Sequence, residues 1–428
     1  MAYTRREWML AMGALPLELG ALGALAACQP PDTEAAGAAP TLGPPPSLPD
    51  RASFPDLRGT YLNAAATHPR SAGSTDLVKK AIGTLAGAPE GFRPSETRVR
   101  ETFARLVNVK PEEVALVPST SIGEYFVASA LGFPERGAHV VSDHLHFVGS
   151  QMMYTDMAKR GVEVTWVKMR DNRISLEALD RAIVRGKTRL VAVSATAFVN
   201  GFQHDLRRVA EIAHAKGAMV YADIIQAAGN VPLDLTASGV DAACCASYKW
   251  LMAGGTAFLY VRPSSQVRMR PPLYHHTQMT TLPTTHMYPF DAPAAEIVDT
   301  YVPKDGAAGM FGMGYTPSPV ALAGLEYSLP YIMNIGVANV QAHAQRLTDR
   351  LKAELPKRGY PLLTPLDARS PIVTVAVENA ERLAPVLNAA NVRVTLRWNH
   401  LRVGTSVFND MDDVDRLLTA LPRAQGPS

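Results

Sequence analysis

The sequence of 428 residues has little of what marks several classes of protein. It contains three cysteines, too few for a disulfide framework, and charged residues make up 19% of the chain with a formal net charge of +3. No basic run or aromatic stacking motif accompanies this small charge, which excludes a nucleic-acid-binding role. The apolar stretch near the N-terminus is short and is interrupted by Pro16 and Glu18, so it makes a poor membrane-spanning helix.

Several ligand-binding motifs are also missing. The chain has neither a Gly-x-x-x-x-Gly-Lys-Ser/Thr loop nor a strand-linked Gly-x-Gly-x-x-Gly motif, which excludes P-loop and dinucleotide-binding enzymes. The spacing of His275, His276 and His286 matches no metal-binding pattern, so we predict no metal site. Cys244 and Cys245 are adjacent in an apolar run, where we expect reduced thiols that pack as small hydrophobic groups.

Two short apolar runs in the middle of the chain predict buried, neighbouring strands of an open α/β sheet. Polar residues follow each run: Asp223 ends the run 218–222, and Ser247, Tyr248 and Lys249 follow the run 242–246. Ligands bind outside the carboxyl ends of the strands in such sheets. An acid and a lysine at one crevice are typical of a pyridoxal phosphate enzyme, in which the lysine forms a Schiff base and the carboxylate keeps the pyridine nitrogen protonated.

The same block resembles the class V aminotransferase family, which includes cysteine desulfurases and isopenicillin N epimerase relatives. Asp223 and Gln226, then 232–234, and then 248–250 match the family's Asp-x-x-Gln, Pro-Leu-Asp and His/Tyr-Lys-Trp pattern in order. The resemblance runs from about residue 61 to residue 421. It implies an α/β protein with the fold type I of pyridoxal-phosphate-dependent transferases, which has a large, mostly parallel sheet with helices on both faces and a small α+β C-terminal domain. We place these two domains at 59–318 and 319–428.

The resemblance also implies the residues that hold pyridoxal 5′-phosphate. Strand 114–117 ends in small hydroxyl residues before a helix, and a helix N-terminus is a natural phosphate site. His144 matches the aromatic position that stacks on the ring, with His146 and Phe147 close behind it. The threonine of the 314–319 segment reaches the partner subunit's cofactor in the family, which implies a homodimer with shared active sites. The cofactor-binding residues expected from the resemblance are Thr120, Ser121, His144, Asp223, Gln226, Ser247, Tyr248, Lys249 and Thr316.

Two further segments indicate where the substrate binds. The opening segment 61–70 resembles the family's Tyr-Leu-Asn-Asn-Ala-Ala segment, which places Asn63 beside the substrate. The segment 401–410 resembles the family's carboxylate-binding pattern, which makes Arg402 the expected ligand of an amino-acid carboxylate, with Arg397 as a weaker neighbour. A guanidinium group matches a carboxylate in bidentate fashion.

The expected catalytic residues are Lys249, Asp223 and His144, and the expected substrate is amino-acid-like. Phe198 stands where desulfurases carry an asparagine, which leaves Gln226 as the main partner of the cofactor's 3′-oxygen. No cysteine follows Cys245, which argues against persulfide-forming desulfurase chemistry. We therefore favour an isopenicillin N epimerase-like or aminotransferase-like enzyme. A C–S lyase is the alternative, as is an exported binding lipoprotein without catalysis, against which the intact Lys249 and Asp223 argue.

The N-terminus resembles an export signal. Residues 4–9 resemble a twin-arginine motif, and 25–28 resemble a lipoprotein processing site that would leave Cys28 as a lipidated first residue. The tract 29–58 is rich in proline and alanine and is typical of a flexible linker. We therefore expect a signal at 1–28, a linker at 29–58, and a periplasmic protein that Cys28 can attach to a membrane.

Overall fold

The computed structural model describes residues 37–88, 91–275, 278–281, 302–313, 317–397 and 399–424. The chain divides into two units, Met1–Ala36 and Gly37–Ser428. The first unit, with the expected signal and Cys28, lies outside the described residues. The second unit carries the fold that follows.

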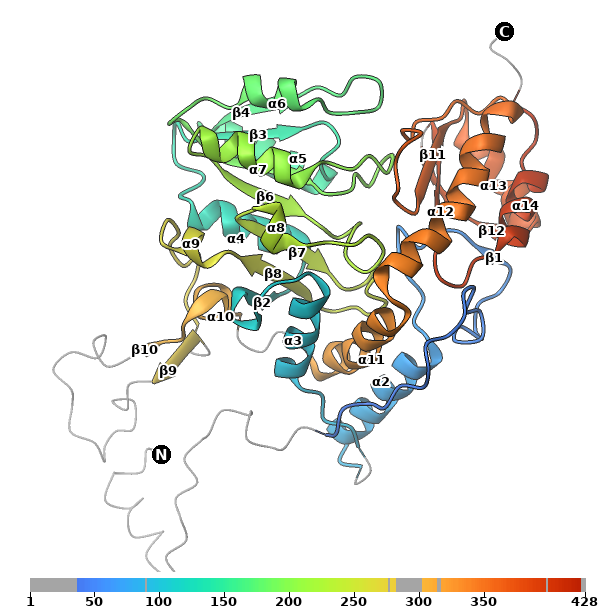
Figure 1. Ribbon diagram of the computed structural model, residues 1–428, viewed down its shortest axis with the longest axis horizontal. Helices are drawn as coiled ribbons and strands as arrows, with labels where there is room; N and C mark the ends of the chain where they lie inside the picture. Colours follow the sequence, from blue (N-terminus) through green and yellow to red (C-terminus); the bar gives the residue numbers. More distant parts are fainter. Residues whose placement is uncertain are drawn as a thin grey trace, which may run out of the picture. The chain divides into compact units, whose positions relative to one another are not determined.

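A seven-stranded sheet forms the centre of the large domain (Figure 1), with the strand order β2-β8-β7-β6-β5-β3-β4. Six strands run parallel to one another, and β8 alone runs antiparallel to its neighbours β2 and β7. The two strands expected from apolar runs are confirmed as β6 and β7. The strands are β2 (Val114–Val117), β3 (His139–Asp143), β4 (Glu163–Val167), β5 (Thr188–Ser194), β6 (Met219–Asp223), β7 (Ala242–Ala246) and β8 (Ala257–Val261).

Helices cover both faces of this sheet, as predicted. Connections between parallel strands are right-handed, so the side on which a helix lies follows from the direction of the step across the sheet. The steps β2 to β3 and β3 to β4 run one way, through α4 (Thr120–Ala130) and α5 (Val148–Lys159). The steps from β4 through β5 and β6 to β7 run the other way, through α6 (Leu176–Ala182), α7 (Leu206–Ala215) and α8 (Leu235–Ser238). The packing of α4 on α5, and of α7 on both α6 and α8, agrees with two separate layers.

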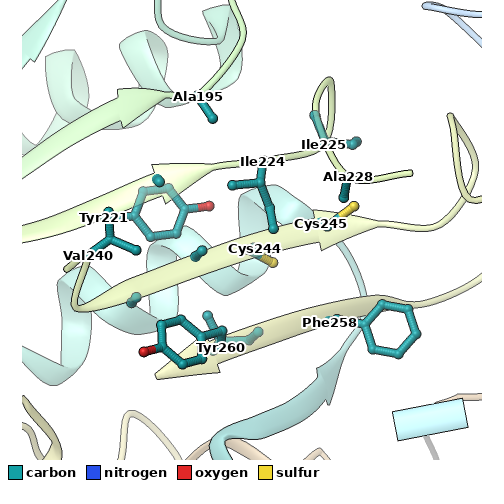
Figure 2. Packing of buried hydrophobic residues seen from close by; sticks show 14 of the residues in the cluster. Ala195, Tyr221, Ile224, Ile225, Ala228, Val240, Cys244, Cys245, Phe258 and Tyr260 are labelled. Atoms are coloured by element: carbon teal, nitrogen blue, oxygen red, sulfur yellow. The ribbon is translucent and has the colours of Figure 1, made fainter. Parts of the chain in front are cut away.

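Buried hydrophobic residues pack around the central strands of the sheet (Figure 2). Cys244 and Cys245 are free and buried in β7, between Tyr221 of β6 and Phe258 of β8. Burial raises the pKa of both thiols far above the ordinary value for cysteine, so they remain protonated and unreactive. The expectation that these cysteines are reduced and structural is confirmed.

The C-terminal part forms a second, smaller core. Its antiparallel sheet has the order β11-β14-β13, with β11 at Ile372–Ala376, β13 at Thr395–Arg397 and β14 at His400–Gly404. A parallel pair joins β1 (Thr60–Tyr61) to β12 (Val392–Arg393). The helices are α12 (Val337–Glu354), α13 (Ala380–Ala389) and α14 (Met411–Ala420). Leu62 and the leucines of α12 and α14 pack together in this core, so the opening segment belongs to both parts of the chain.

Long helices connect the two cores. The helix α11 (Pro319–Ile335) packs on α2 (Ala72–Leu85) and α3 (Glu96–Leu106). Gly336 separates α11 from α12, and its φ of +84° is a conformation that glycine adopts without strain. Leu325 and Leu329 of α11 contribute to the large core, whereas Leu347 and Leu351 of α12 contribute to the smaller one.

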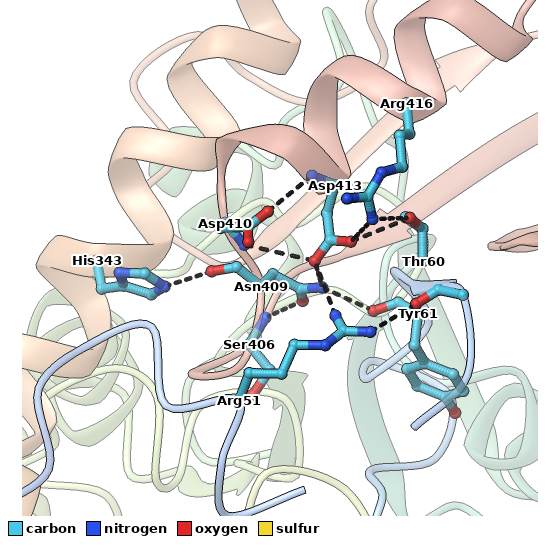
Figure 3. A network of polar contacts seen from close by, with 10 residues as sticks. Arg51, Thr60, Tyr61, His343, Ser406, Asn409, Asp410, Asp413 and Arg416 are labelled. Carbon is cyan, nitrogen blue, oxygen red and sulfur yellow. Dashed lines mark hydrogen bonds and ion pairs between the residues drawn. The ribbon is translucent and has the colours of Figure 1, made fainter. Parts of the chain in front are cut away.

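A buried carboxylate ties the segment before β1 to the smaller domain (Figure 3). Asp413 of α14 accepts hydrogen bonds from the Thr60 hydroxyl at 3.0 Å and from the Asn409 amide at 2.9 Å. Arg51 and Arg416 lie within 3.5 Å and 3.4 Å of the same carboxylate. Buried carboxylates require such partners, so this network fixes the path of the chain into β1.

Among the described helices, none has the length and apolar character that a bilayer-spanning segment needs. The described residues also contain no group of three or more potential metal ligands.

Candidate active site

Lys249 and Asp223 follow adjacent parallel strands and lie at the same edge of the sheet. Asp223 ends β6, where it is paired in register with Cys244 of β7, and Lys249 lies three residues beyond the end of β7. Only 3% of Asp223 and 6% of Lys249 is exposed. Each side chain perturbs the pKa of the other, which shows that the two charges interact. The structure therefore brings together the acid and the lysine that the sequence placed at one crevice.

The surroundings of Lys249 favour its neutral amine. Burial lowers the pKa of Lys249 to about 8, the nearby carboxylate of Asp223 opposes that decrease, and the guanidinium of Arg402 adds to it. Burial raises the pKa of Asp223, and His146 and the Ile225 N–H act against that increase. The Ile225 N–H donates to one carboxylate oxygen of Asp223 at 2.9 Å. A lysine with this pKa supplies a substantial fraction of free amine near neutral pH.

The N-terminus of α4 lies at the same edge of the sheet. Ser119 caps this helix by accepting a hydrogen bond from the Ile122 N–H at 3.2 Å. The Thr120 hydroxyl accepts a hydrogen bond from the Ala246 N–H at 2.9 Å, which joins the helix to the end of β7, and Ser121 is exposed. The first-turn N–H groups of a helix have no intrahelical acceptor, so this end suits an anion. Thr316, the other predicted phosphate ligand, lies outside the described residues.

Gln226 holds the lysine loop against the opening segment. Its amide nitrogen donates to the Ala65 carbonyl at 2.9 Å, and its oxygen accepts from the Trp250 indole at 2.9 Å. The side chain is 1% exposed. One N–H and one oxygen lone pair of the amide remain for another partner, so contact with a cofactor oxygen stays a prediction.

Ser247 and Tyr248 flank the lysine in different ways. Ser247 is fully buried, and its hydroxyl donates to the Thr256 carbonyl at 2.9 Å. Tyr248 is 39% exposed, and the Lys249 amine lies 5.6 Å from the centre of its ring. Their assignment to cofactor binding remains a prediction.

Arg402 is a buried cation without a carboxylate partner among the described residues. It is 7% exposed and donates to the Phe198 carbonyl at 2.7 Å and to the Thr395 hydroxyl at 3.1 Å. Thr395 in turn donates to Asn63 at 2.6 Å, so both predicted substrate residues belong to one chain of contacts. The Nε of Arg402 is buried and unpaired. Burial and the neighbouring Arg397 lower the pKa of Arg402 to about 10. An anion would satisfy this group.

His144 is exposed just after β3, where its backbone carbonyl accepts from Gln151 at 3.2 Å. Its assignment as the stacking residue remains a prediction. Phe147, three residues later, is half-buried, and its ring lies edge-on to Phe198 at 5.5 Å. A Cβ added to Gly149 would meet Phe147 and lie 3.7 Å from the Ser121 hydroxyl, so Phe147 lies beside the α4 N-terminus. Phe147 is therefore a second candidate for stacking on a bound ring.

His68, to which no role was assigned from the sequence, connects the opening segment to both halves of the site. It is 3% exposed, and its ring nitrogens contact the Pro69 carbonyl at 2.7 Å and the Ser406 hydroxyl at 2.6 Å. The carbonyl can only accept, so Nδ1 carries the proton and Nε2 accepts from Ser406. The backbone N–H of His68 also donates to the Tyr248 carbonyl at 3.0 Å. His68 thereby fixes the lysine loop against the loop that follows β14.

Because His68 is buried as a neutral ring, we expect the protein to lose folding stability in acid. Burial lowers the pKa of His68 from 6.5 to about 4, so the folded protein favours the neutral ring. The resulting stabilisation is complete above pH 6.5 and is lost as the pH falls towards 4, because the unfolded chain binds the proton first. We expect the free energy of unfolding of the wild type to fall by about 3 kcal/mol more across that window than that of His68→Gln. Urea unfolding of the two apoproteins at several pH values measures this, and equal pH slopes would contradict it.

Comparisons with known proteins place these residues in context. The family model of "Aminotransferase class-V" matches residues 94–417. A kynureninase from Xanthomonas oryzae pv. oryzae is 30% identical over 334 residues, covering 72% of this chain and 75% of that protein. An uncharacterized aminotransferase, YcbU, from Bacillus subtilis is 26% identical over 327 residues, covering 74% of this chain and 80% of that protein.

Solved structures show the same fold. The cystine C–S lyase C-DES, in complex with cysteine persulfide, superposes with a TM-score of 0.75 at 18% identity over 87% of this chain and 100% of that chain. The cysteine desulfurase CsdA from Escherichia coli gives a TM-score of 0.72 at 18% identity over 86% of this chain and 96% of that chain. The predicted fold, a large α/β domain with a small C-terminal sheet, is confirmed.

Proposed function

The chain belongs to the class V aminotransferase family, and from that premise we propose that Lys249, Asp223 and Arg402 form an active site that acts at the α-carbon of an amino-acid-like substrate. The protein is a pyridoxal-phosphate-dependent enzyme of this family. The observation that carries the proposed substrate class is the buried guanidinium of Arg402, whose Nε has no partner among the described residues. The interaction of Arg402 with the charge of Lys249 supports a common pocket.

The residues at this edge of the sheet fit the cofactor. Asp223 supplies a buried carboxylate for a positively charged ring nitrogen, because only one of its oxygens is engaged by a backbone N–H. Lys249 supplies a partly neutral amine for the aldehyde carbon. The N-terminus of α4, with the exposed Ser121, supplies donors for the phosphate group. Either His144 or Phe147 would cover the ring.

Each residue then has a separate task. When bound, the cofactor supplies an electron-withdrawing ring that stabilises negative charge on the substrate α-carbon. Arg402 binds the substrate carboxylate and orients the bonds at that carbon, with Asn63 and Thr395 holding the guanidinium in place. The amine of Lys249 takes the α-proton and returns it, a step favoured by its lowered pKa. Asp223 retains its negative charge opposite the ring nitrogen throughout.

Replacement of Arg402 by alanine raises KM for an amino-acid substrate. Charge-assisted hydrogen bonds contribute about 1.5–3 kcal/mol each, so we expect KM to rise about 100-fold, with a smaller effect on kcat. Arg397, the exposed arginine opposite His400 on the neighbouring strand, provides a matched control. Steady-state kinetics of Arg402→Ala and Arg397→Ala test this expectation. An equal rise of KM in both variants would show that general positive charge, and not Arg402, attracts the substrate.

For the reaction type, we propose chemistry that begins with removal of the α-proton, as in an isopenicillin N epimerase-like or aminotransferase-like enzyme. The buried, protonated state of Cys244 and Cys245 supports a reaction that uses no protein thiolate. A lyase that cleaves a bond at the β-carbon is the second candidate. Its support is the 30% identity to kynureninases and the fold shared with the cystine C–S lyase C-DES.

One experiment separates these reaction types. The cofactor-loaded enzyme is incubated with a panel of L-amino acids in deuterated water, with and without a keto acid as amino acceptor. Deuterium at the α-carbon with change of configuration indicates epimerisation, and a keto acid formed together with a second amino acid indicates transamination. Release of pyruvate, alanine or sulfide indicates cleavage at the β-carbon. If no amino acid exchanges its α-proton and none is converted, the proposed function is wrong.

We further propose that the enzyme is exported through the twin-arginine pathway and lipidated at Cys28. The support is the sequence of 4–9 and 25–28. We expect that replacing Arg5 and Arg6 together by lysine retains the protein in the cytoplasm, and that Cys28→Ala releases it from membranes. Cell fractionation with immunoblotting measures both effects. An unchanged distribution of the double lysine variant would contradict export by this pathway.

We also propose a homodimer with shared active sites. The support is the segment 314–319, which matches the family segment that contacts the partner's cofactor. Complementation tests it, because mixing inactive Lys249→Ala with inactive Thr316→Val subunits should restore part of the activity in the mixed dimers. No recovery after subunit exchange would favour independent active sites.

A further inference from the structure

A second group of buried charged residues lies behind Asp223. His146, which follows β3, is fully buried and bridges two elements. Its Nε2 lies 2.9 Å from a carboxylate oxygen of Glu124 on α4, and its Nδ1 lies 2.9 Å from the hydroxyl of Ser194 on β5. Glu124 is 1% exposed, and its other oxygen accepts from the Ser150 hydroxyl at 2.5 Å. None of these residues takes part directly in the proposed reaction.

Ser194 connects the cluster to the site. It is paired in register with Asp223 on the adjacent parallel strand, so both side chains project from the same face of the sheet. Tyr221, two residues before Asp223, projects from this face as well, and its hydroxyl lies 3.5 Å from the Thr120 carbonyl at the start of α4. This face is therefore the one that α4 covers. On this face, His146 contacts Ser194, and Ser194 is the strand neighbour of Asp223.

The protonation state of His146 determines the direction of the Ser194 hydroxyl. The Glu124 carboxylate accepts, so Nε2 of His146 carries a proton in either state. If the ring is neutral, Nδ1 has no proton and must accept the Ser194 hydroxyl hydrogen. If the ring is charged, Nδ1 donates to the Ser194 oxygen, and the hydroxyl hydrogen is free to point elsewhere. Asp223 is paired in register with Ser194 on the adjacent strand.

We propose that His146 is a positioning residue that Glu124 holds in its charged form against Ser194, the strand neighbour of Asp223, and that the charge of His146 keeps the Asp223 carboxylate ionised for the cofactor's ring nitrogen. This inference rests on the proposed role of Asp223. The electrostatic balance agrees with it, because the carboxylates of Glu124, Asp223 and Asp143 raise the pKa of His146 despite its burial. In the opposite direction, the charge of His146 counteracts the burial that raises the pKa of Asp223.

Other ionisable groups face this cluster and contribute to its pH dependence. On the side of β3, Asp143 is paired with His204 at 3.1 Å. On the side of α5, Tyr154 lies near Glu124. On the side of β7, Lys249 and Cys245 interact electrostatically with Asp223, and Cys244 interacts with Tyr221. The groups are Glu124, Asp143, Tyr154, His204, Tyr221, Asp223, Cys244, Cys245 and Lys249.

The first test measures the charge of His146 directly in the cofactor-free protein. Nuclear magnetic resonance of protein with ¹⁵N-labelled histidine follows the titration, and His146→Asn identifies the signals. We expect His146 to remain doubly protonated above pH 6.5 and Glu124→Gln to move its midpoint down by about one pH unit or more. A wild-type His146 that is already neutral at pH 6 would overturn the proposal.

The second test measures the consequence for Asp223 by cofactor binding. Without the charged ring, Asp223 takes up a proton at higher pH than in the wild type, so the variants lose affinity as the pH falls. We expect the dissociation constant of pyridoxal 5′-phosphate to rise about tenfold near pH 6.5 in His146→Asn and Glu124→Gln, and to approach the wild-type value at high pH. A deficit that is the same at every pH would indicate a purely structural role and contradict the proposal.

His139 supplies the matched control. It is 3% exposed at the other end of β3, and its ring contacts the hydroxyls of Thr188 and Thr165 at 2.8 Å and 2.9 Å. His139→Asn should leave cofactor affinity unchanged even if it lowers the melting temperature as much as His146→Asn does. Circular dichroism confirms that each variant is folded before binding is measured. If the wild type itself takes up no cofactor, the proposed function is wrong. The titration of His146 in the cofactor-free protein tests the charge of His146 independently of that result.

Discussion

The variant Lys249→Ala is expected to lose about four orders of magnitude in kcat, because it lacks both the amine that joins the cofactor and the base that moves the α-proton. Lys249 is 6% exposed, burial lowers its pKa to about 8, and the charge of Asp223 acts on it. Steady-state kinetics with a substrate identified from the amino-acid panel measures the loss, and visible absorbance shows the altered state of the cofactor.

Lys352 offers a control of equal burial. It is also 6% exposed, but its amine donates to the carbonyls of Leu366 and Ala368 at 3.0 Å in the smaller domain. Lys352→Met should lower the stability of the fold and leave the visible spectrum and kcat near their wild-type values. Retention of more than about a tenth of the wild-type kcat by Lys249→Ala would remove Lys249 from the mechanism.

The variant Asp223→Asn is expected to keep the cofactor attached to Lys249 but to lose about a thousandfold in kcat. An amide of the same shape cannot stabilise a positive ring nitrogen, and electrostatic groups of this kind contribute about 10² to 10³ in rate. Asp223 also raises the pKa of Lys249, so its removal should lower the pKa of that amine further below 8. The pH dependence of cofactor uptake by the apoprotein should therefore shift to lower pH in the variant.

Asp241 provides the comparison for Asp223→Asn. It precedes β7 at the opposite edge of the sheet, is 6% exposed, and is held by His214 at 2.8 Å and Ser265 at 2.6 Å. Asp241→Asn should reduce the free energy of unfolding without changing the pH dependence of cofactor uptake. If the two variants lost activity to the same extent, the effect of Asp223 would be structural.

Local patterns predicted the parts of the site that lie close together in the sequence. The apolar runs before Asp223 and before Lys249 became β6 and β7, and their parallel pairing brought the two residues to one edge. The resemblance of segment 401–410 predicted Arg402 as a carboxylate ligand, and the structure places Arg402 buried in β14 between Leu401 and Val403. Asp223 and Lys249 lie at or just beyond the carboxyl end of a strand, whereas Arg402 lies in the middle of β14.

Contacts between distant segments could not be predicted in this way. His146 meets Glu124 across 22 residues and Ser194 across 48, and each of these residues alone is typical of many unrelated positions. The same holds for His68 and Ser406, which are 338 residues apart. The packing of α4 on the sheet and of the opening segment on β14 determines these contacts, and neither depends on a local pattern. Gly404 reflects the close packing of the opening segment on β14, because a Cβ at this position would lie 2.7 Å from Ala65.

Reduction of the cofactor-loaded enzyme with borohydride, followed by peptide mass spectrometry, tests the central assignment most directly. We predict that the mass of the reduced cofactor is found on the peptide that contains Lys249 and that the visible absorbance disappears in parallel. A cofactor mass on any other lysine, or none on this peptide while the absorbance persists, would contradict it.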